Sequence, residues 1–401
     1  MKYALICLFC FAFVPKTFTQ DSLRKFWLGK TTGNIPHLDY GLGEDRLGGA
    51  KMTYLDTNIV LKIIDSAGDN YKVQLSKYHS AYIYKSLVAT DSLLISKPYY
   101  LTDKWMIWGD STNDYVHIKT FDKLPYTSIQ QLSPTRIVID VFGAVSNTNR
   151  ITQLNTAKEI KAAWYEQPED DVMRVFIELN HPQIWGYHIA YDTSGLLVTV
   201  KRQKDILQWS KFTVAVDAGH GGSNVGAAGV TTKVGEKVYT LQFAKQLQAV
   251  LAENGFNVIM TRTKDTNIAM ADRVLMMRSI NPDILISLHL NSDPYDTVRG
   301  ASTYYRYIGF RSLSQAIYNR MLALGLNEYG NSGSFNFGLS GPTEYPNCLV
   351  EIAFLSNKSD EKRIVDPIFQ RQVAMQITEG LKDWLTVNNV QLPKAGTFIK
   401  Q

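Results

Sequence analysis

The chain has 401 residues, of which 45% are hydrophobic and 20% are charged. This composition is typical of globular proteins, and the length exceeds what one core usually holds, so two or three domains are expected. The 42 basic and 37 acidic residues leave a formal charge of +5. That excess is too small to indicate a nucleic-acid partner, and we expect none.

Residues 1–20 have the pattern of a secretory signal peptide. Lys2 gives a basic start, residues 4–14 form an apolar core, and Pro15 with small or polar residues follows. A membrane span needs roughly 18 or more apolar residues, so we expect cleavage and no membrane span afterwards, with an uncleaved anchor as the alternative. The mature protein is therefore expected outside the cytoplasm, either periplasmic or secreted.

The three cysteines indicate neither redox chemistry nor disulfide bonding. Cys7 and Cys10 form a C-x-x-C pair, but both lie inside the predicted signal and would leave with it. The start of the chain also lacks a lipid-attachment pattern, so we do not predict a lipoprotein. Cys348 would then be the only mature cysteine, which excludes an intramolecular disulfide.

Residues 21–96 show short β runs broken by turns. The predicted strands are 51–54, 59–64, 71–75 and 81–84, with a turn cluster at 65–70. Apolar and polar residues alternate in these runs, which fits a small barrel with one buried face. The stretch resembles a bacterial SH3-like domain, a module often joined to cell-wall enzymes.

Residues 97–205 form a second β-rich stretch. Its clearest predicted strands are 136–141, 173–179, 186–191 and 196–200, and residues 192–195 are the turn between the last two. This region resembles an AMIN domain, a β module found ahead of many cell-wall amidases and associated with targeting to the envelope. An unspecialised β sandwich is the alternative interpretation.

From 210 to 388 the pattern alternates between strands and helices, which predicts an α/β domain with a mainly parallel sheet covered by helices. The predicted strands are 212–216, 256–260, 284–289, 302–305 and 349–352, and helical spacing recurs at 241–251, 268–275, 313–324 and 369–385. Ligands of such sheets lie beyond the carboxyl ends of strands, where His220 and His289 fall. Residues 389–401 are expected to be a flexible tail.

Four residues of this region suit a hydrolytic metal site. His220 stands among glycines after an apolar strand, Glu236 closes that glycine-rich loop at the start of a helix, and His289 ends a buried strand. Glu351 lies inside an apolar strand, where a bare carboxylate is expensive to bury. A catalytic zinc keeps three protein ligands and one open position for water, and a further carboxylate can take a proton from that water.

Each of these residues also has a simpler explanation when it is taken alone. Acids favour the first turn of a helix, which would account for Glu236, and a histidine at the end of a strand is more often a hydrogen-bonded structural residue. A dinucleotide-binding loop starting at Gly219 would need glycine at position 224, where the sequence has Asn224. The order of the residues and the glycine loop favour the metal site.

The region resembles the zinc-dependent N-acetylmuramoyl-L-alanine amidases often called amidase 3, in order from about Phe212 to Leu385. The segments that carry the resemblance are 217–222, 235–237, 261–262 with Asp265, Arg273, 287–291, 300–305 and 351–357. The resemblance implies that His220, Glu236 and His289 bind one zinc ion, that Glu351 is the catalytic general base, and that Asn291 and Arg273 bind substrate. The implied substrate is peptidoglycan, cut between the lactyl group of N-acetylmuramic acid and L-alanine.

The chain departs from the family pattern at two places. Ala353 stands where the family usually has glycine, and its methyl group is expected to reduce the space at the bottom of the site beside Glu351. The run between Tyr305 and Leu339 is too short for the inhibitory helix of some relatives, so we expect activity without an activator protein. Two rival interpretations are a cell-wall cysteine peptidase that uses Cys348 and a wall-binding protein without catalysis.

Overall fold

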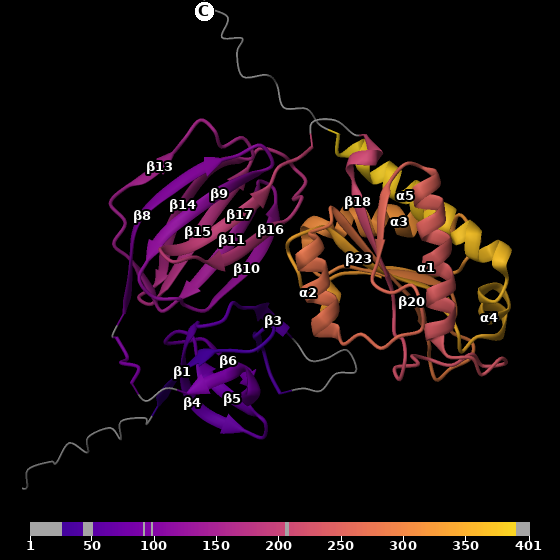
Figure 1. Ribbon diagram of the computed structural model, residues 1–401, viewed down its shortest axis with the longest axis horizontal. Coiled ribbons are helices and arrows are strands. Elements are labelled where there is room, and N and C mark those ends of the chain that lie inside the picture. Colours follow the sequence, from indigo (N-terminus) through magenta and orange to yellow (C-terminus); the bar gives the residue numbers. More distant parts are fainter. Residues whose placement is uncertain (1–25, 43–50, 91–92, 98, 205–207, 390–401) are drawn as a thin grey trace, which may run out of the picture.

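The structure, a computed structural model, describes residues 26–42, 51–90, 93–97, 99–204 and 208–389. The predicted signal and residues 390–401 of the predicted tail lie outside the described residues. Two all-β units precede an α/β unit (Figure 1), as the sequence predicts. Within the described residues, the structure contains no helix with the length and apolar character needed to cross a membrane.

The first unit is a seven-stranded antiparallel sheet in the order β3-β2-β6-β5-β4-β1-β7. Its strands are β1 (Trp27–Thr31), β2 (His37–Asp39), β3 (Lys51–Tyr54), β4 (Val60–Ala67), β5 (Asn70–Gln74), β6 (Ser80–Tyr84) and β7 (Val88–Thr90). Sequence analysis missed β1, β2 and β7. It also made the turn at 65–70 too long, because Ser66 and Ala67 pair with β5 and only Gly68 and Asp69 turn. The SH3-like resemblance stays a prediction.

The second unit has a four-stranded sheet, β10-β11-β15-β14, and a six-stranded sheet, β12-β8-β9-β17-β16 with β13 beside β8 (Figure 1). Its strands are β8 (Tyr100–Gly109), β9 (Asn113–Thr120), β10 (Tyr126–Leu132), β11 (Thr135–Phe142), β12 (Ala144–Ser146), β13 (Ile151–Gln153), β14 (Ile160–Glu169), β15 (Val172–Leu179), β16 (Tyr187–Tyr191) and β17 (Gly195–Lys201). The four predicted strands correspond to β11, β15, β16 and β17.

The two β units share one buried apolar cluster. It contains Leu38 and Ile63 of the first unit together with Trp105 and Ile177 of the second. Alternate residues are buried along strands such as β9, which places one face of each strand inside and the other outside. Because this one cluster contains residues of both, the two β units are packed against each other.

The α/β unit has a six-stranded sheet in the order β19-β18-β20-β23-β21-β22. Its neighbouring strands are parallel except β21 and β23. The strands are β18 (Thr213–Ala218), β19 (Asn257–Met260), β20 (Ile284–Asn291), β21 (Ala301–Tyr304), β22 (Glu328–Ser332) and β23 (Asn347–Phe354). The helices are α1 (Glu236–Glu253), α2 (Met270–Ile280), α3 (Arg311–Leu322), α4 (Lys358–Ile364) and α5 (Pro367–Val387). Sequence analysis missed the short elements β22 and α4.

The two faces of this sheet are covered differently. Even-numbered residues of β18, β20 and β23 pack in the main apolar cluster with α1, α3 and α5. Ala215, Leu285 and Leu349 face the other way, into a smaller cluster with α2. Because side chains alternate along a strand, His289 and Glu351 emerge on the α2 face. In Figure 1 that helix lies on the side of the sheet nearer the β units.

The second β unit reaches into the main cluster of the α/β unit through Trp185. This side chain is 6% exposed, and its ring centroid lies 5.1 Å from that of Trp384 on α5 and 6.1 Å from that of Phe212. Aromatic rings at such separations attract each other beyond the effect of burial. The α/β core is thus completed by a residue from the preceding unit.

Candidate metal centre

His220 stands directly after β18 in a backbone conformation that is unusual for histidine. Its φ is 62°, and the next two residues, Gly221 and Gly222, have φ of 132° and 59°. The Nδ1 atom lies 2.9 Å from the Asn224 side-chain oxygen, which also accepts the Gly226 N–H. Nδ1 must therefore donate, and this leaves Nε2 as the ring atom that faces Glu236.

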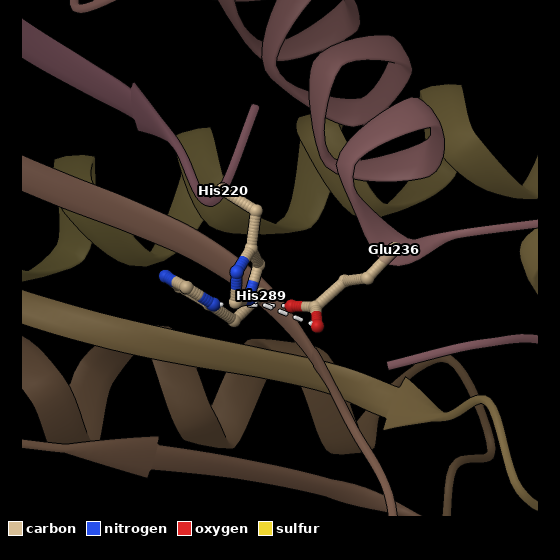
Figure 2. Close-up of side chains that lie close together, drawn as sticks. All are labelled: His220, Glu236 and His289. Carbon is tan, nitrogen blue, oxygen red and sulfur yellow. Dashed lines mark hydrogen bonds and ion pairs between the residues drawn. The ribbon is translucent and has the colours of Figure 1, made fainter. Parts of the chain in front are cut away.

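Glu236 is the first residue of α1, as predicted, and connects the two histidines (Figure 2). Its Oε1 lies 3.0 Å from His289 Nδ1, and its Oε2 lies 3.0 Å from His220 Nε2. The backbone N–H groups of Leu290 and Ala227 each donate to one of these oxygens at 3.0 Å. Burial opposes ionisation, but the two histidines outweigh it and hold the pKa of Glu236 well below its usual value.

His289 lies near the end of β20 and is 8% exposed. Its ring centroid is 4.9 Å from that of His220, at an interplanar angle of 76°. Burial would lower the pKa of His289, but Glu236, Glu351 and Asp217 together raise it. Its Nε2 is buried and has no hydrogen-bond partner among the described residues. The ring nitrogen that faces Glu236 is Nδ1 (Figure 2), so Nδ1 is the candidate ligand atom of His289.

The three residues fit a zinc ion by their chemistry. One ligand atom from each of His220, Glu236 and His289 lies within 4.8 Å of the others. Two imidazoles and one carboxylate are a donor set of catalytic zinc sites, which keep a further position for water. Among the described residues, these three form the one group of at least three histidine, cysteine or acidic side chains close enough together to hold a metal ion.

Two glycines make room for these side chains. A Cβ atom on Gly219 would come closer than 3.0 Å to three ring atoms of His289. A Cβ atom on Gly226 would come equally close to the side chains of Glu236 and His220, and this glycine also has φ of 68°. The glycine-rich loop therefore closes on the cluster only because these positions lack side chains.

We expect Gly219→Ala to displace the His289 ring and to reduce zinc binding and turnover together. Zinc content by elemental analysis and the rate of amide cleavage would measure both. Gly41→Ala is the matched control, because among the described residues no atom beyond the chain neighbours of Gly41 lies within 4 Å of a Cβ at that position. Full zinc content in Gly219→Ala would contradict this role for the glycine.

Glu351 lies beside His289 in the sheet. β23 runs parallel to β20 with Glu351 opposite His289, and β21 places Ser302 on the other side of Glu351. The Glu351 side chain is partly buried, and its charge contributes to raising the pKa of His289. A carboxylate is thus held next to the histidine cluster on the same face of the sheet.

The two residues expected to bind substrate lie in different surroundings. Asn291 ends β20, and its side-chain oxygen accepts the Ser292 N–H at 2.8 Å. Arg273 is only 4% exposed and donates to Asp217 and to the carbonyl oxygens of Ala218 and His220. Its donors are therefore used inside the protein. These contacts hold the His220 loop in place, and substrate binding by Arg273 stays a prediction.

Sequence analysis missed most of the supporting network. Asp217 is 1% exposed and accepts from Thr261 at 2.7 Å and from Ser287 at 2.6 Å, besides Arg273. Arg262 donates to the carbonyl oxygens of Ala218 and Gly219, both at 2.9 Å. The reasoning applied to Glu351, that a carboxylate in an apolar strand needs partners, would have found Asp217 as well.

Two neighbouring positions in β23 bear on earlier expectations. Ala353 has no exposed surface and packs in the main apolar cluster, so its methyl group does not narrow an open floor beside Glu351. Cys348 is 2% exposed, and burial raises the pKa of its thiol to about 12. A thiol in that state does not ionise near neutral pH and is a poor nucleophile.

Comparisons with known proteins agree with this organisation. Residues 214–383 match the sequence model of the family described as N-acetylmuramoyl-L-alanine amidase, and residues 106–200 match that of the AMIN domain. The chain is similar to the probable cell wall amidases LytH of Staphylococcus saprophyticus, at 33% identity over 175 residues, and of Staphylococcus aureus, at 32% over 200 residues. These alignments cover 43% and 50% of this chain and 58% and 65% of the relatives, so the chain spans less than two thirds of their lengths.

Two solved structures are also similar. One is the catalytic domain of CwlV, an N-acetylmuramoyl-L-alanine amidase from Paenibacillus polymyxa, with 30% identity and a TM-score of 0.42 over 44% of this chain and 99% of that one. The other is an N-acetylmuramoyl-L-alanine amidase from Clostridium difficile, with 31% identity and the same TM-score over 44% and 97%. Residues 214–383 of this chain therefore match the N-acetylmuramoyl-L-alanine amidase family, and residues 106–200 match the AMIN domain ahead of that region.

Proposed function

We propose that this protein is a zinc-dependent peptidoglycan hydrolase that cleaves the amide between the lactyl group of N-acetylmuramic acid and L-alanine. The observation that carries the proposal is the convergence of His220, Glu236 and His289, with Glu351 beside His289, in a region of the amidase family. Those three residues would hold the ion. A bound zinc supplies Lewis acidity and lowers the pKa of water towards about 7.

The surrounding residues would prepare the site and move the proton. Asn224 fixes the tautomer of His220, and Glu236 orients both imidazoles. Glu351 accepts a proton from the attacking water while the water oxygen bonds to the lactyl carbonyl carbon. Glu351 then passes that proton to the nitrogen of L-alanine as the carbon–nitrogen bond breaks. The products are a lactyl carboxylate and a stem peptide with a free amino terminus.

The family and the AMIN domain support work at the cell wall, outside the cytoplasm. The predicted secretory signal agrees with that location. We propose that the AMIN domain brings the amidase site to the envelope and that no activator protein is required. The second proposal follows from residues 305–339, which we expect to be too short for an inhibitory helix. They contain α3 and β22, and α3 packs against α5 and β21.

The test is cleavage of purified peptidoglycan by the purified protein alone. We expect free amino-terminal L-alanine to appear, a chelator to abolish the reaction, and added zinc to restore it. A thiol reagent should have no effect on the native protein, because Cys348 is buried and its thiol is protonated. Loss of activity with the thiol reagent but not the chelator would support the cysteine peptidase instead. Full zinc content without any cleavage would indicate a wall-binding protein.

A further inference from the structure

A loop of the α/β unit lies directly against the candidate metal centre. We call residues 335–341 the wall segment. Its Phe337 is 8% exposed, and the Phe337 ring stands edge-on to the His289 ring, with centroids 5.5 Å apart and an interplanar angle of 82°. Phe337 and Leu339 belong to the apolar cluster on the α2 face, where His289 and Glu351 emerge. The wall segment therefore borders the space beside the proposed ligands.

The wall segment is compact within itself. The Phe337 N–H donates to Ser340 Oγ at 3.1 Å, and that hydroxyl lies 2.8 Å from the Phe337 carbonyl oxygen and 2.9 Å from that of Phe335. The Phe335 N–H donates to the Tyr305 carbonyl oxygen at 3.0 Å. Because these bonds tie Phe337 to Phe335 and Ser340, we expect a displacement elsewhere in the segment to move the Phe337 ring.

The first β unit holds this segment from outside. Tyr54, at the end of β3, donates its hydroxyl proton to the Gly338 carbonyl oxygen at 3.1 Å. A Cβ atom on Gly341 would lie closer than 3.0 Å to the Tyr54 ring, so only glycine admits the ring there. Burial raises the pKa of Tyr54 to about 12, which keeps the hydroxyl protonated and able to donate.

A second anchor joins the same two parts. Arg306 donates to the backbone carbonyl oxygens of Lys51 at 2.6 Å and Met52 at 3.0 Å in β3. Its other terminal nitrogen donates to the Asn336 side-chain oxygen at 2.8 Å. The guanidinium thus bridges the first β unit and the wall segment, and its fork geometry is suited to several acceptors at once. Ile35 of the first unit adds an apolar contact in the cluster that contains Phe337.

We propose that Tyr54 and Arg306 are positioning residues of the active site, and that the first β unit acts through the wall segment to set how the substrate is held beside His289. The proposal depends on the proposed function for the identity of the substrate. The contacts of Tyr54 and Arg306 with the wall segment are observed independently of that function. A unit attached only as a targeting module would not need to reach the segment that borders the ligands. Tyr54 and Ile35 reach that segment or its apolar cluster from the first β unit, and Arg306 of the α/β unit ties the segment to the backbone of β3.

The test uses the full chain with Tyr54→Phe, which keeps the ring and removes one hydrogen bond, and Arg306→Lys, which keeps the charge and removes the fork. We expect faster amide hydrogen exchange confined to residues 335–341. We also expect a KM for peptidoglycan fragments raised about 2- to 10-fold, the range that one net hydrogen bond gives. Zinc content and kcat should stay near the wild-type values. Tyr78→Phe is the control, because Tyr78 lies in the same unit and is 71% exposed.

Unchanged exchange in the wall segment would overturn the proposal, and so would faster exchange across the whole first unit, because Tyr54 would then be merely structural. An unchanged KM despite faster exchange would also overturn it, since the wall segment would not touch substrate. If the wild-type protein releases no amine, the proposed function fails. Hydrogen exchange alone then still decides whether Tyr54 and Arg306 hold the segment.

Discussion

Glu351→Gln should keep its full equivalent of zinc and lose turnover by about 10²- to 10⁴-fold, the usual contribution of a general acid–base residue. Glutamine preserves the size of the side chain but cannot accept a proton from water. Glu351 neighbours His289 across the strand pair and is not one of the three clustered residues, so metal binding should survive. Zinc content and the rate of amine release, measured on the same preparation, separate the two effects.

The control for this variant is Glu328→Gln. Glu328 lies on the edge strand β22 of the same sheet and is exposed, so its amide variant should cleave peptidoglycan at the wild-type rate. If Glu351→Gln stayed within threefold of wild type, Glu351 would not be the base. If it lost its zinc, Glu351 would instead be part of the metal site.

Glu236→Gln is expected to lose zinc as well as activity. The two oxygens of Glu236 each accept a backbone N–H, from Leu290 and from Ala227. An amide places a nitrogen donor against one of these donors and also removes the negative charge between the two histidines. Removing a residue that hydrogen-bonds to a metal ligand lowers metal affinity about 10- to 100-fold, so removing the ligand itself should lower it at least as much.

Elemental analysis after dialysis against a weak chelator would measure the effect. Glu253→Gln is the matched control, because Glu253 lies at the other end of α1, its side chain is 54% exposed, and it pairs with Arg371 on the surface. One retained equivalent of zinc in Glu236→Gln would remove Glu236 from the proposed ligand set.

The α/β unit and the approach of His220, Glu236 and His289 to one another were predictable because their sequence signals are local. An apolar strand that runs into glycines places His220, and a carboxylate that closes the loop places Glu236 at the first turn of α1. Glu351 was recognisable because an acid inside an apolar strand needs a partner. The short elements β22 and α4 were missed because tertiary packing rather than periodicity determines such segments.

The role of Arg273 and the position of Phe337 could not be predicted for a different reason. An arginine on a helix is usually exposed, and only the fold shows that this one turns inward to Asp217 and the His220 carbonyl. Phe337 lies in a glycine- and serine-rich stretch with no periodic pattern. Its contact with His289 depends on long-range closure of the chain, which leaves no mark in the nearby sequence.

The insertion of Trp185 into the core of the α/β unit fixes the position of the AMIN domain relative to the amidase region. Modules on a flexible tether find a second site with an effective concentration that depends on linker length. Here Trp185 packs against Trp384 and Phe212, so the AMIN domain and the amidase region meet through buried side chains. On the proposed function, an AMIN domain that binds the envelope would therefore hold the amidase region at a fixed distance and angle, and the packing of the two units would determine which amide bonds the site can reach.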